Sequence, residues 1–167
     1  ELSRPWNRAS SFAPMPDPAK AEVRINIEKL FAPDAENPNA EKIHDYSMRY
    51  FFGRKVEGRR GDLSSKKRIV FRGRSLTMNP SWIQVALVTK NGNAYGGVIK
   101  IEPASQDYEL LLSQLKRVRL VTLPRPYPTF LPYYFQGNDA DNLDMKDIET
   151  LQISLGPGVP QSELGKS

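Results

Sequence analysis

The stretch 66–102 constrains the fold more than any other part of the chain, because apolar residues recur at every second position in it. Side chains of a β-strand point alternately to its two faces, so this spacing predicts strands. The turn Lys90-Asn91-Gly92-Asn93 separates two of the segments and predicts a β-hairpin. We assign to the core the apolar residues of these segments and of the last predicted strand, namely Ile69, Phe71, Ile83, Val85, Leu87, Ile99, Ile153 and Leu155.

The opposite face of these strands carries polar and aromatic side chains. If both segments belong to one sheet, Arg72, Arg74, Trp82 and Gln84 share this face, and Arg49 from an earlier strand can join them. A tryptophan in a strand is most often a core residue, but aliphatic residues already fill the core face here. Aromatic rings stack on sugars, and guanidinium and amide groups bond hydroxyls or carboxylates. We therefore predict that these five residues bind a ligand.

The remaining segments also fit strands. Strands are predicted over 21–31, 43–56 and 148–155, whereas 58–65 has the composition of a loop. The segment 108–123 predicts two strands or one bent strand, with a helical turn at Leu110–Leu112 as the alternative. Residues 124–135, with four prolines and five aromatic residues, predict an ordered irregular lid over the core.

About eight strands with frequent turns indicate an all-β sandwich of the jelly-roll type. We expect an extended lead-in over 1–20, the β-sandwich domain over 21–160 and a tail over 161–167.

Length and composition narrow the class of protein. The chain has 167 residues, 39% of them hydrophobic, which suits one domain with a real core. It has no apolar run long enough to span a membrane and no apolar leader. Because the sequence begins at Glu1 and ends in a loose polar tail, we expect a mature or excised piece of a longer protein. The absence of cysteine excludes disulfides and thiol catalysis.

No catalytic motif is visible. The single histidine, His44, has no triad arrangement beside it, and the acidic residues lie mainly in predicted loops. The run Asp139, Asp141, Asn142 and Asp144 offers hard oxygen ligands, so a structural calcium ion is an alternative to a solvated loop, although the EF-hand pattern is absent. We therefore expect a non-enzymatic chain with no cofactor, leaving structural calcium as an open alternative.

The net charge of +5 results from 24 basic and 19 acidic residues, and many of the basic ones lie between positions 54 and 74. They fit either a charged strand edge that resists aggregation or a surface for a polyanion. Basic residues interleaved with aromatics suit single-stranded nucleic acid, but the charge excess is small and no OB-fold or RNP pattern is present.

Four segments of the sequence resemble a known family. They are DLSSKKRIVFRGRSL (62–76), SWIQVALVTKNGNAYGGVIKI (81–101), LPRPYPTFLPYYF (123–135) and IETLQISLGPG (148–158). They resemble the β-jelly-roll carbohydrate-binding domains of the galactose-binding-like type, over about two thirds of the chain. The matching motifs belong to the scaffold, so no ligand residue is carried over, and Thr89 stands where the family often has an acid.

The resemblance implies a non-catalytic module that holds a polysaccharide-degrading enzyme on its glycan. Its partners would be a polysaccharide or oligosaccharide and an adjacent catalytic domain of the same chain. The module would be a monomer, secreted, periplasmic or exposed on the cell surface. The arginines of the predicted face favour an acidic glycan. The alternative is a structural β-sandwich domain that packs against the catalytic domain of a multidomain glycosidase.

Overall fold

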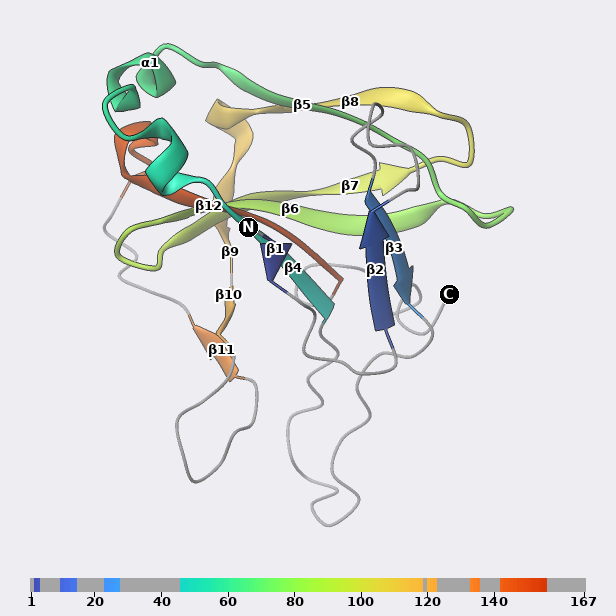
Figure 1. Ribbon diagram of the computed structural model, residues 1–167. Coiled ribbons are helices and arrows are strands. Elements are labelled where there is room, and N and C mark those ends of the chain that lie inside the picture. Colours follow the sequence, from blue (N-terminus) through green and yellow to red (C-terminus); the bar gives the residue numbers. More distant parts are fainter. Residues whose placement is uncertain are drawn as a thin grey trace, which may run out of the picture.

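The computed structural model of the protein describes the backbone of residues 2–3, 10–14, 23–27, 46–118, 120–122, 133–135 and 142–155, and the side chains of residues 48–118 and 142–154. Within these ranges the chain forms twelve β-strands, one short α-helix and three 3-10 turns (Figure 1). All strand pairs are antiparallel. None of the described helices has the length and apolar character needed to cross a lipid bilayer.

Six strands form the main sheet. Their order is β1 (Leu2–Ser3), β4 (Tyr46–Phe51), β12 (Ile148–Leu155), β6 (Ser81–Thr89), β7 (Ala94–Ile101) and β9 (Lys116–Val118). The last strand, β12, lies between β4 and β6, so the sheet is complete only when the C-terminal strand is in place. The predicted hairpin is confirmed as β6 and β7. Gly92 in its turn has a φ of 84°, which glycine adopts without steric strain.

A two-stranded sheet of β5 (Arg68–Gly73) and β8 (Gln106–Leu111) lies over the main sheet (Figure 1). Leu110 approaches Gly97 of β7 so closely that a Cβ atom at Gly97 would lie 3.0 Å from Leu110 Cδ2. The rings of Phe71 and Tyr108 stack within the β5–β8 sheet, with centroids 5.5 Å apart. The two sheets pack face to face, which confirms the predicted all-β sandwich.

The predicted core residues lie on the faces of the two sheets that meet. Val85 and Leu87 are buried, with exposed fractions of 1% and 4%. Cross-strand pairing places Ile83 opposite Ile99 and Val85 opposite Ile153, so these side chains share one face. The half-buried members are Ile69, Phe71, Ile83, Ile99 and Ile153, and the side chain of Leu155 lies outside the described residues. The alternation in the sequence thus identified Val85 and Leu87 as buried, but Gln84, Ala86 and Val88 on the opposite face of β6 are buried as well, with exposed fractions of 1%, 1% and 7%.

Local structure differs from the prediction in one loop. Residues 58–65 contain a short helix, α1 (Arg60–Ser64), which follows the 3-10 turn η2 (Gly53–Val56). Arg60 of this helix donates hydrogen bonds to the carbonyl oxygens of Lys146 and Ile148, which are distant in the sequence. Tertiary contacts thus support a turn of helix that the local composition does not reveal.

The segment 108–123 contains both strands and a helical turn, the two alternatives that the sequence left open. After β8 the chain forms the 3-10 turn η3 (Leu112–Gln114), then β9 and β10 (Leu120–Thr122). β10 pairs with β11 (Tyr133–Phe135), so the end of the predicted irregular lid is a strand. The rest of that lid lies outside the described residues, as does His44. A further pair consists of β2 (Ser10–Pro14) and β3 (Val23–Ile27).

Candidate functional site

Polar side chains line the face of the main sheet that points away from β5 and β8. Gly97 and its partner Val85 face Leu110 of β8, so the alternate residues of β6 and β7 face the other way. Residues opposite each other in a sheet point to the same side. We call this surface the polar face and define it by residues of β4, β6 and β12, namely Arg49, Trp82, Gln84, Thr150, Gln152 and Ser154.

Hydrogen bonds connect the polar face across strands. Arg49 Nε donates to Gln152 Oε1 at 2.8 Å, and Gln84 Nε2 donates to Ser154 Oγ at 3.4 Å. Gln84, Gln152 and Ser154 are each 1% exposed. Arg49 and Trp82 are half-buried. The buried amides therefore hold their neighbours in place, and the two larger side chains retain accessible surface.

Small residues occupy the centre of this face. Ala86 of β6 lies opposite Gly96 of β7, and Val88 lies opposite Ala94. A Cβ atom at Gly96 would lie 2.6 Å from the carbonyl oxygen of Val85 and 2.9 Å from Ala86 Cβ. No larger side chain fits at Gly96, and the small residues Ala86, Val88 and Ala94 around it are themselves buried.

The charge of the polar face is positive. Lys100 lies opposite Trp82 and Lys116 lies opposite Gly96, so both lysines point to the same side as Arg49. Lys100 forms an ion pair with Glu102 at 3.2 Å. In the strands β4, β6, β7, β9 and β12, no described residue in register on this face is acidic.

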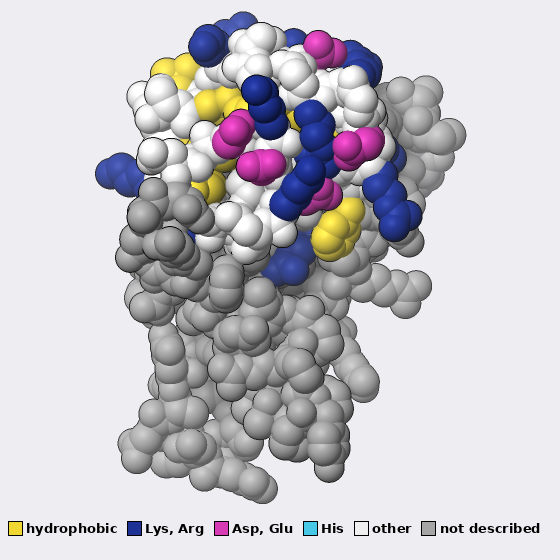
Figure 2. All heavy atoms as spheres, turned by 90° about the vertical axis from the view of Figure 1, so that its left-hand side faces the viewer, with side chains coloured by type: hydrophobic (Ala, Val, Ile, Leu, Met, Phe, Trp, Pro, Cys, Tyr) yellow, Lys and Arg dark blue, Asp and Glu magenta, His cyan; other side chains and the backbone are white. Residues whose placement is uncertain are grey.

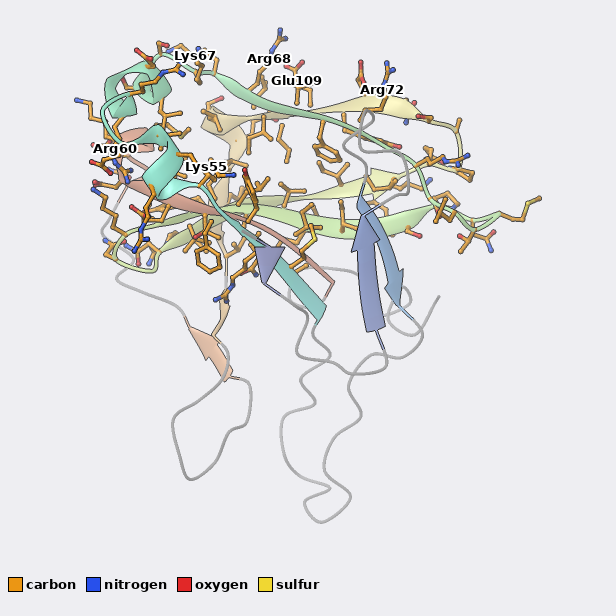
Figure 3. All side chains as sticks on the ribbon, in the orientation of Figure 1. Lys55, Arg60, Lys67, Arg68, Arg72 and Glu109 are labelled. Carbon is orange, nitrogen blue, oxygen red and sulfur yellow. The ribbon has the colours of Figure 1, made fainter. Side chains whose placement is uncertain are left out.

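Arg72 and Arg74 do not lie on the polar face. Arg72 belongs to β5, which pairs with β8, and it points away from the main sheet together with Arg68 and Glu109 (Figure 3). Its guanidinium contacts both carboxylate oxygens of Asp107, at 2.7 and 3.3 Å. This hydrogen bond and the negative charge of Asp107 raise the pKa of Arg72. Arg74 is exposed beyond the end of β5.

The expected arrangement of one shared sheet is therefore wrong. Residues 74–80 lead the chain from one layer to the other, so β5 and β6 are consecutive in the sequence but belong to different sheets. The structure brings Arg49, Trp82 and Gln84 together and separates them from Arg72 and Arg74. An acid accompanies Arg72, because Asp107 lies opposite it in β8.

Comparison with known proteins found similarity in structure only. No protein-family model matches the chain, and no curated protein matches it. Among solved structures, the chain is similar to the family 11 carbohydrate-binding module of a cellulosomal cellulase from Clostridium thermocellum, with 16% identity and a TM-score of 0.43. The match covers 69% of this chain and 59% of that module.

Two other solved structures are similar to the chain. A family 11 module from Clostridium thermocellum in complex with a β-1,3-1,4-mixed-linked tetrasaccharide has 19% identity and a TM-score of 0.43, over 66% of this chain and 58% of that one. An exo-β-agarase has 11% identity and a TM-score of 0.49, over 93% of this chain and 20% of the agarase. The chain thus spans less than two thirds of each of these proteins.

Sequence reasoning missed the contribution of β12 to the polar face. Thr150, Gln152 and Ser154 alternate with apolar residues in the segment IETLQISL, so the signal was present. The position of β12 between β4 and β6, which brings these residues beside Arg49 and Gln84, follows from long-range pairing and not from local sequence.

The predicted calcium ligands are only partly described. Asp139 and Asp141 lie outside the described residues. Asn142 and Asp144 line a polar pocket together with Asp147. In the described part of the chain, no group of three or more acidic, histidine or cysteine side chains converges on one point.

Proposed function

We propose that this chain is a non-catalytic carbohydrate-binding module that binds a glycan across its polar face. The observation that carries the proposal is the alignment of Arg49, Gln152, Gln84 and Ser154 in neighbouring strands, with Trp82 at the same face. An aromatic ring covers the apolar side of a sugar ring, and guanidinium and amide groups bond its hydroxyls. A β-sheet scaffold holds these groups at fixed spacing.

The exposed fraction of each side chain indicates whether it contacts the ligand or positions a neighbour. Trp82 and Arg49 are half-buried, and Lys100 and Lys116 are exposed, so these four residues contact the ligand directly. Gln152 holds the Arg49 guanidinium at 2.8 Å, and Gln84, which is buried, donates to Ser154 of the neighbouring strand. We assign Gln84 and Gln152 a positioning role. The contacts extend from β4 to β9, five neighbouring strands at about 4.8 Å spacing, which suits an oligosaccharide better than a single sugar.

The charge of the face favours an acidic glycan. Arg49 and Lys116 contribute positive charge, Lys100 is paired with Glu102, and guanidinium groups pair bidentately with carboxylate and sulfate groups. A neutral glucan does not require these charges. The ligand class predicted from the sequence is therefore retained, although Arg49 remains as the only arginine of the original five residues on this face.

Calorimetric titration tests this proposal with acidic and neutral oligosaccharides. We expect Trp82→Ala and Arg49→Ala to weaken binding of the acidic oligosaccharide roughly tenfold or more, as for central contacts of an interface. Arg72→Ala is the matched control, because this arginine is exposed on the other sheet. Equal binding by all three variants, or a loss confined to Arg72→Ala, would place the ligand elsewhere. Equal affinity for neutral chains would refute the acidic class.

A structural domain beside a catalytic domain is the second candidate. The loop between β5 and β6 favours it, because Leu76 and Met78 are 54% and 94% exposed there. Ser75 braces this loop through hydrogen bonds with Thr77 Oγ1, Ser81 Oγ and the carbonyl oxygen of Asn79. A rigid loop that presents apolar side chains suits contact with a neighbouring domain.

Affinity electrophoresis on a panel of polysaccharides separates the two candidates. Retardation of the isolated chain favours the binding module. The structural role is favoured if no polysaccharide retards the chain and if the neighbouring domain stabilises the chain against unfolding. Met78→Ser should then remove this stabilisation. In either case we propose that the chain is monomeric and acts outside the cytoplasm, where polysaccharides are met.

A further inference from the structure

A second polar depression lies at one end of the main sheet, where the β6–β7 hairpin meets residues 142–147. Its volume is about 280 Å³, and its lining consists of Thr89, Asn91, Asn93, Tyr95, Asn142, Asp144 and Asp147. Figure 2 shows this end of the molecule, where acidic side chains lie among lysines and arginines. We call the depression the hairpin pocket.

The lining of the hairpin pocket includes buried polar groups held by hydrogen bonds. Thr89, Asn93 and Tyr95 are 6%, 3% and 4% exposed. Thr89 donates to the carbonyl oxygen of Asn93 through its backbone N–H at 2.9 Å and its hydroxyl at 3.1 Å. The N–H of Lys90 donates to the carbonyl oxygen of Asp147 at 2.8 Å and joins the two walls. The pocket is therefore formed before any ligand enters.

The other part of the lining is exposed and acidic. Asn142, Asp144 and Asp147 are exposed. Asp144 Oδ1 accepts a hydrogen bond from the N–H of Lys146 at 2.9 Å. Among the described residues, no side-chain donor contacts the carboxylate of Asp147 and no lysine or arginine lines the pocket, but Arg117 contacts the lining residue Tyr95, donating to its hydroxyl at 3.2 Å and lying over its ring. The negative charge of the two exposed carboxylates disfavours phosphate, sulfate and uronate groups in this pocket.

We propose that the hairpin pocket binds a single neutral sugar ring. Sugar hydroxyls both donate and accept, and the amide and hydroxyl groups of the lining do the same. The carboxylates of Asp144 and Asp147 accept from two hydroxyls, in charge-assisted hydrogen bonds that are stronger than neutral ones. Tyr95 also lines the pocket, with Arg117 lying over its ring. The inference rests on the proposed function for its ligand class, but it uses none of the residues of the polar face.

The two sites differ in charge and therefore in the part of a glycan that they select. The polar face carries Arg49, Lys100 and Lys116, whereas the hairpin pocket carries two carboxylates. An acidic chain fits the first site, and a neutral residue fits the second. A module with both sites holds a glycan that contains acidic and neutral sugars at two separate points.

A metal ion is the competing occupant of the pocket. The described lining supplies only two carboxylates, and Asp144 Oδ1 already accepts the N–H of Lys146. Asn91 Oδ1 likewise accepts from the N–H of Asn93 at 3.3 Å. Calcium prefers six to eight oxygen ligands. Two carboxylates in the described lining supply fewer oxygens than this, and the experiment below includes calcium as a separate titrant.

Nuclear magnetic resonance titration of the whole chain tests the proposal with glucose, galactose and mannose. We expect one of these sugars to shift the amide resonances of residues 89–95 and 142–147 in a saturable manner. Asp147→Asn should weaken this binding roughly tenfold, because it removes a charge-assisted hydrogen bond. Asp107→Asn is the matched control, since it makes the same substitution at an exposed acid outside the pocket. Its affinity for the sugar should equal that of the unmodified chain.

Three outcomes would overturn the proposal: no saturable shifts with any of these sugars, equal affinity in Asp147→Asn, or calcium alone shifting the same resonances and blocking the sugar. Trp82→Ala distinguishes this site from the polar face. If the pocket still binds the sugar while oligosaccharide binding is insensitive to Trp82→Ala and Arg49→Ala, the polar-face assignment fails and the pocket remains. If only the pocket resonances fail to respond, the polar-face proposal is untouched.

Discussion

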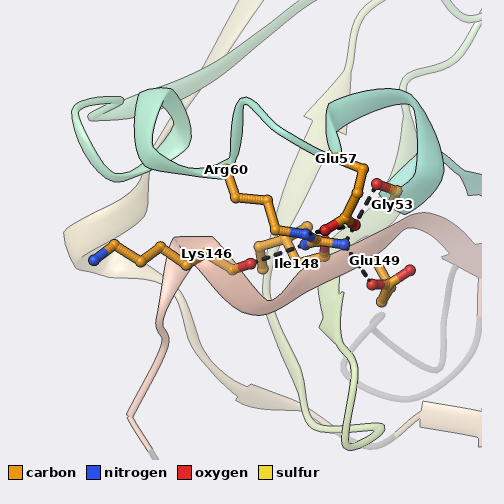
Figure 4. Close-up of polar contacts among 6 residues, drawn as sticks. All are labelled: Gly53, Glu57, Arg60, Lys146, Ile148 and Glu149. Atoms are coloured by element: carbon orange, nitrogen blue, oxygen red, sulfur yellow. Dashed lines mark hydrogen bonds and ion pairs between the residues drawn. The ribbon is translucent and has the colours of Figure 1, made fainter.

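Arg60 Nη2 lies 2.7 Å from Glu149 Oε1, and this ion pair joins α1 to β12 (Figure 4). The same guanidinium donates through Nη1 to the carbonyl oxygens of Lys146 and Ile148, at 2.8 and 2.9 Å, and through Nε to Glu57 at 3.1 Å. The Arg60 side chain is only 13% exposed. One guanidinium thus fastens the helix to the strand that supplies half of the polar face and to the segment that lines the hairpin pocket.

Replacing Arg60 should destabilise the fold. Partial desolvation lowers the pKa of Arg60, but hydrogen bonds and charge from Glu57 and Glu149 outweigh it and raise the pKa. In Arg60→Lys the ammonium cannot reach the same acceptors, because it lacks the planar fork of the guanidinium. We expect Tm to fall by several degrees in thermal unfolding followed by circular dichroism. Arg59→Ala is the control, since its ion pair with Asp62 is exposed and should leave Tm unchanged.

Two adjacent glycines of β7 should respond differently to the same substitution. A methyl group at Gly96 would meet the carbonyl oxygen of Val85 at 2.6 Å, a backbone atom that cannot move independently. A methyl group at Gly97 would meet Leu110 Cδ2 at 3.0 Å, which a small rotation of that side chain relieves. We expect Gly96→Ala to cost about 1–3 kcal/mol in urea unfolding and Gly97→Ala clearly less. Equal costs would show that the centre of the polar face tolerates larger residues.

The sequence predicted the layers of the fold better than their connections. Alternation in β6 identified Val85 and Leu87 as core, because a period of two is a local property of a strand. It could not show that β5 pairs with β8, since pairing depends on contacts between residues more than thirty positions apart, such as Phe71 and Tyr108. For that reason the sequence placed Arg72 and Arg74 on the same face as Trp82, whereas they do not lie on the main sheet.

The same limit applies to the candidate site, of which the sequence indicated the local pattern but not the long-range pairing. The period of two predicts Trp82, Gln84 and Arg49 on one face of the sheet, and strand pairing places them there, although Gln84 is buried. Gln152 was not predicted there, although it lies opposite Arg49, because the place of β12 in the sheet is set by tertiary packing. The hairpin pocket combines a turn with a segment about fifty residues later, and only its Asn142 and Asp144 had been noted as ligands from the sequence.

The hydrogen bond between Arg49 and Gln152 should couple their effects on binding. In Gln152→Leu the guanidinium loses the amide that holds it, so oligosaccharide affinity should fall even though Gln152 is buried. We expect Arg49→Ala and Gln152→Leu to be non-additive, with the double variant binding no more weakly than Arg49→Ala alone. Calorimetric titration of the three variants measures this coupling. Fully additive losses would indicate that Gln152 contacts the ligand independently of Arg49.

The turn of the β6–β7 hairpin provides the last prediction. Gly92 has a φ of 84°, and its N–H donates to the carbonyl oxygen of Thr89 at 2.9 Å. Gly92→Ala forces a side chain into this left-handed conformation at a cost of about 1–2 kcal/mol in urea unfolding. Gly58→Ala should cost a similar amount, because Gly58 has a φ of 80° and a Cβ there meets nothing within 4 Å.

Only the first of these two substitutions disturbs the hairpin pocket, because Thr89, Asn91 and Asn93 of its lining belong to the Gly92 turn. We expect Gly92→Ala to reduce the sugar-induced shifts of residues 89–95, and Gly58→Ala to leave them intact at the same loss of stability. The comparison separates a local change in the pocket from general destabilisation. If both variants lose sugar binding equally, the response follows stability, and the shape of the turn does not determine what the pocket binds.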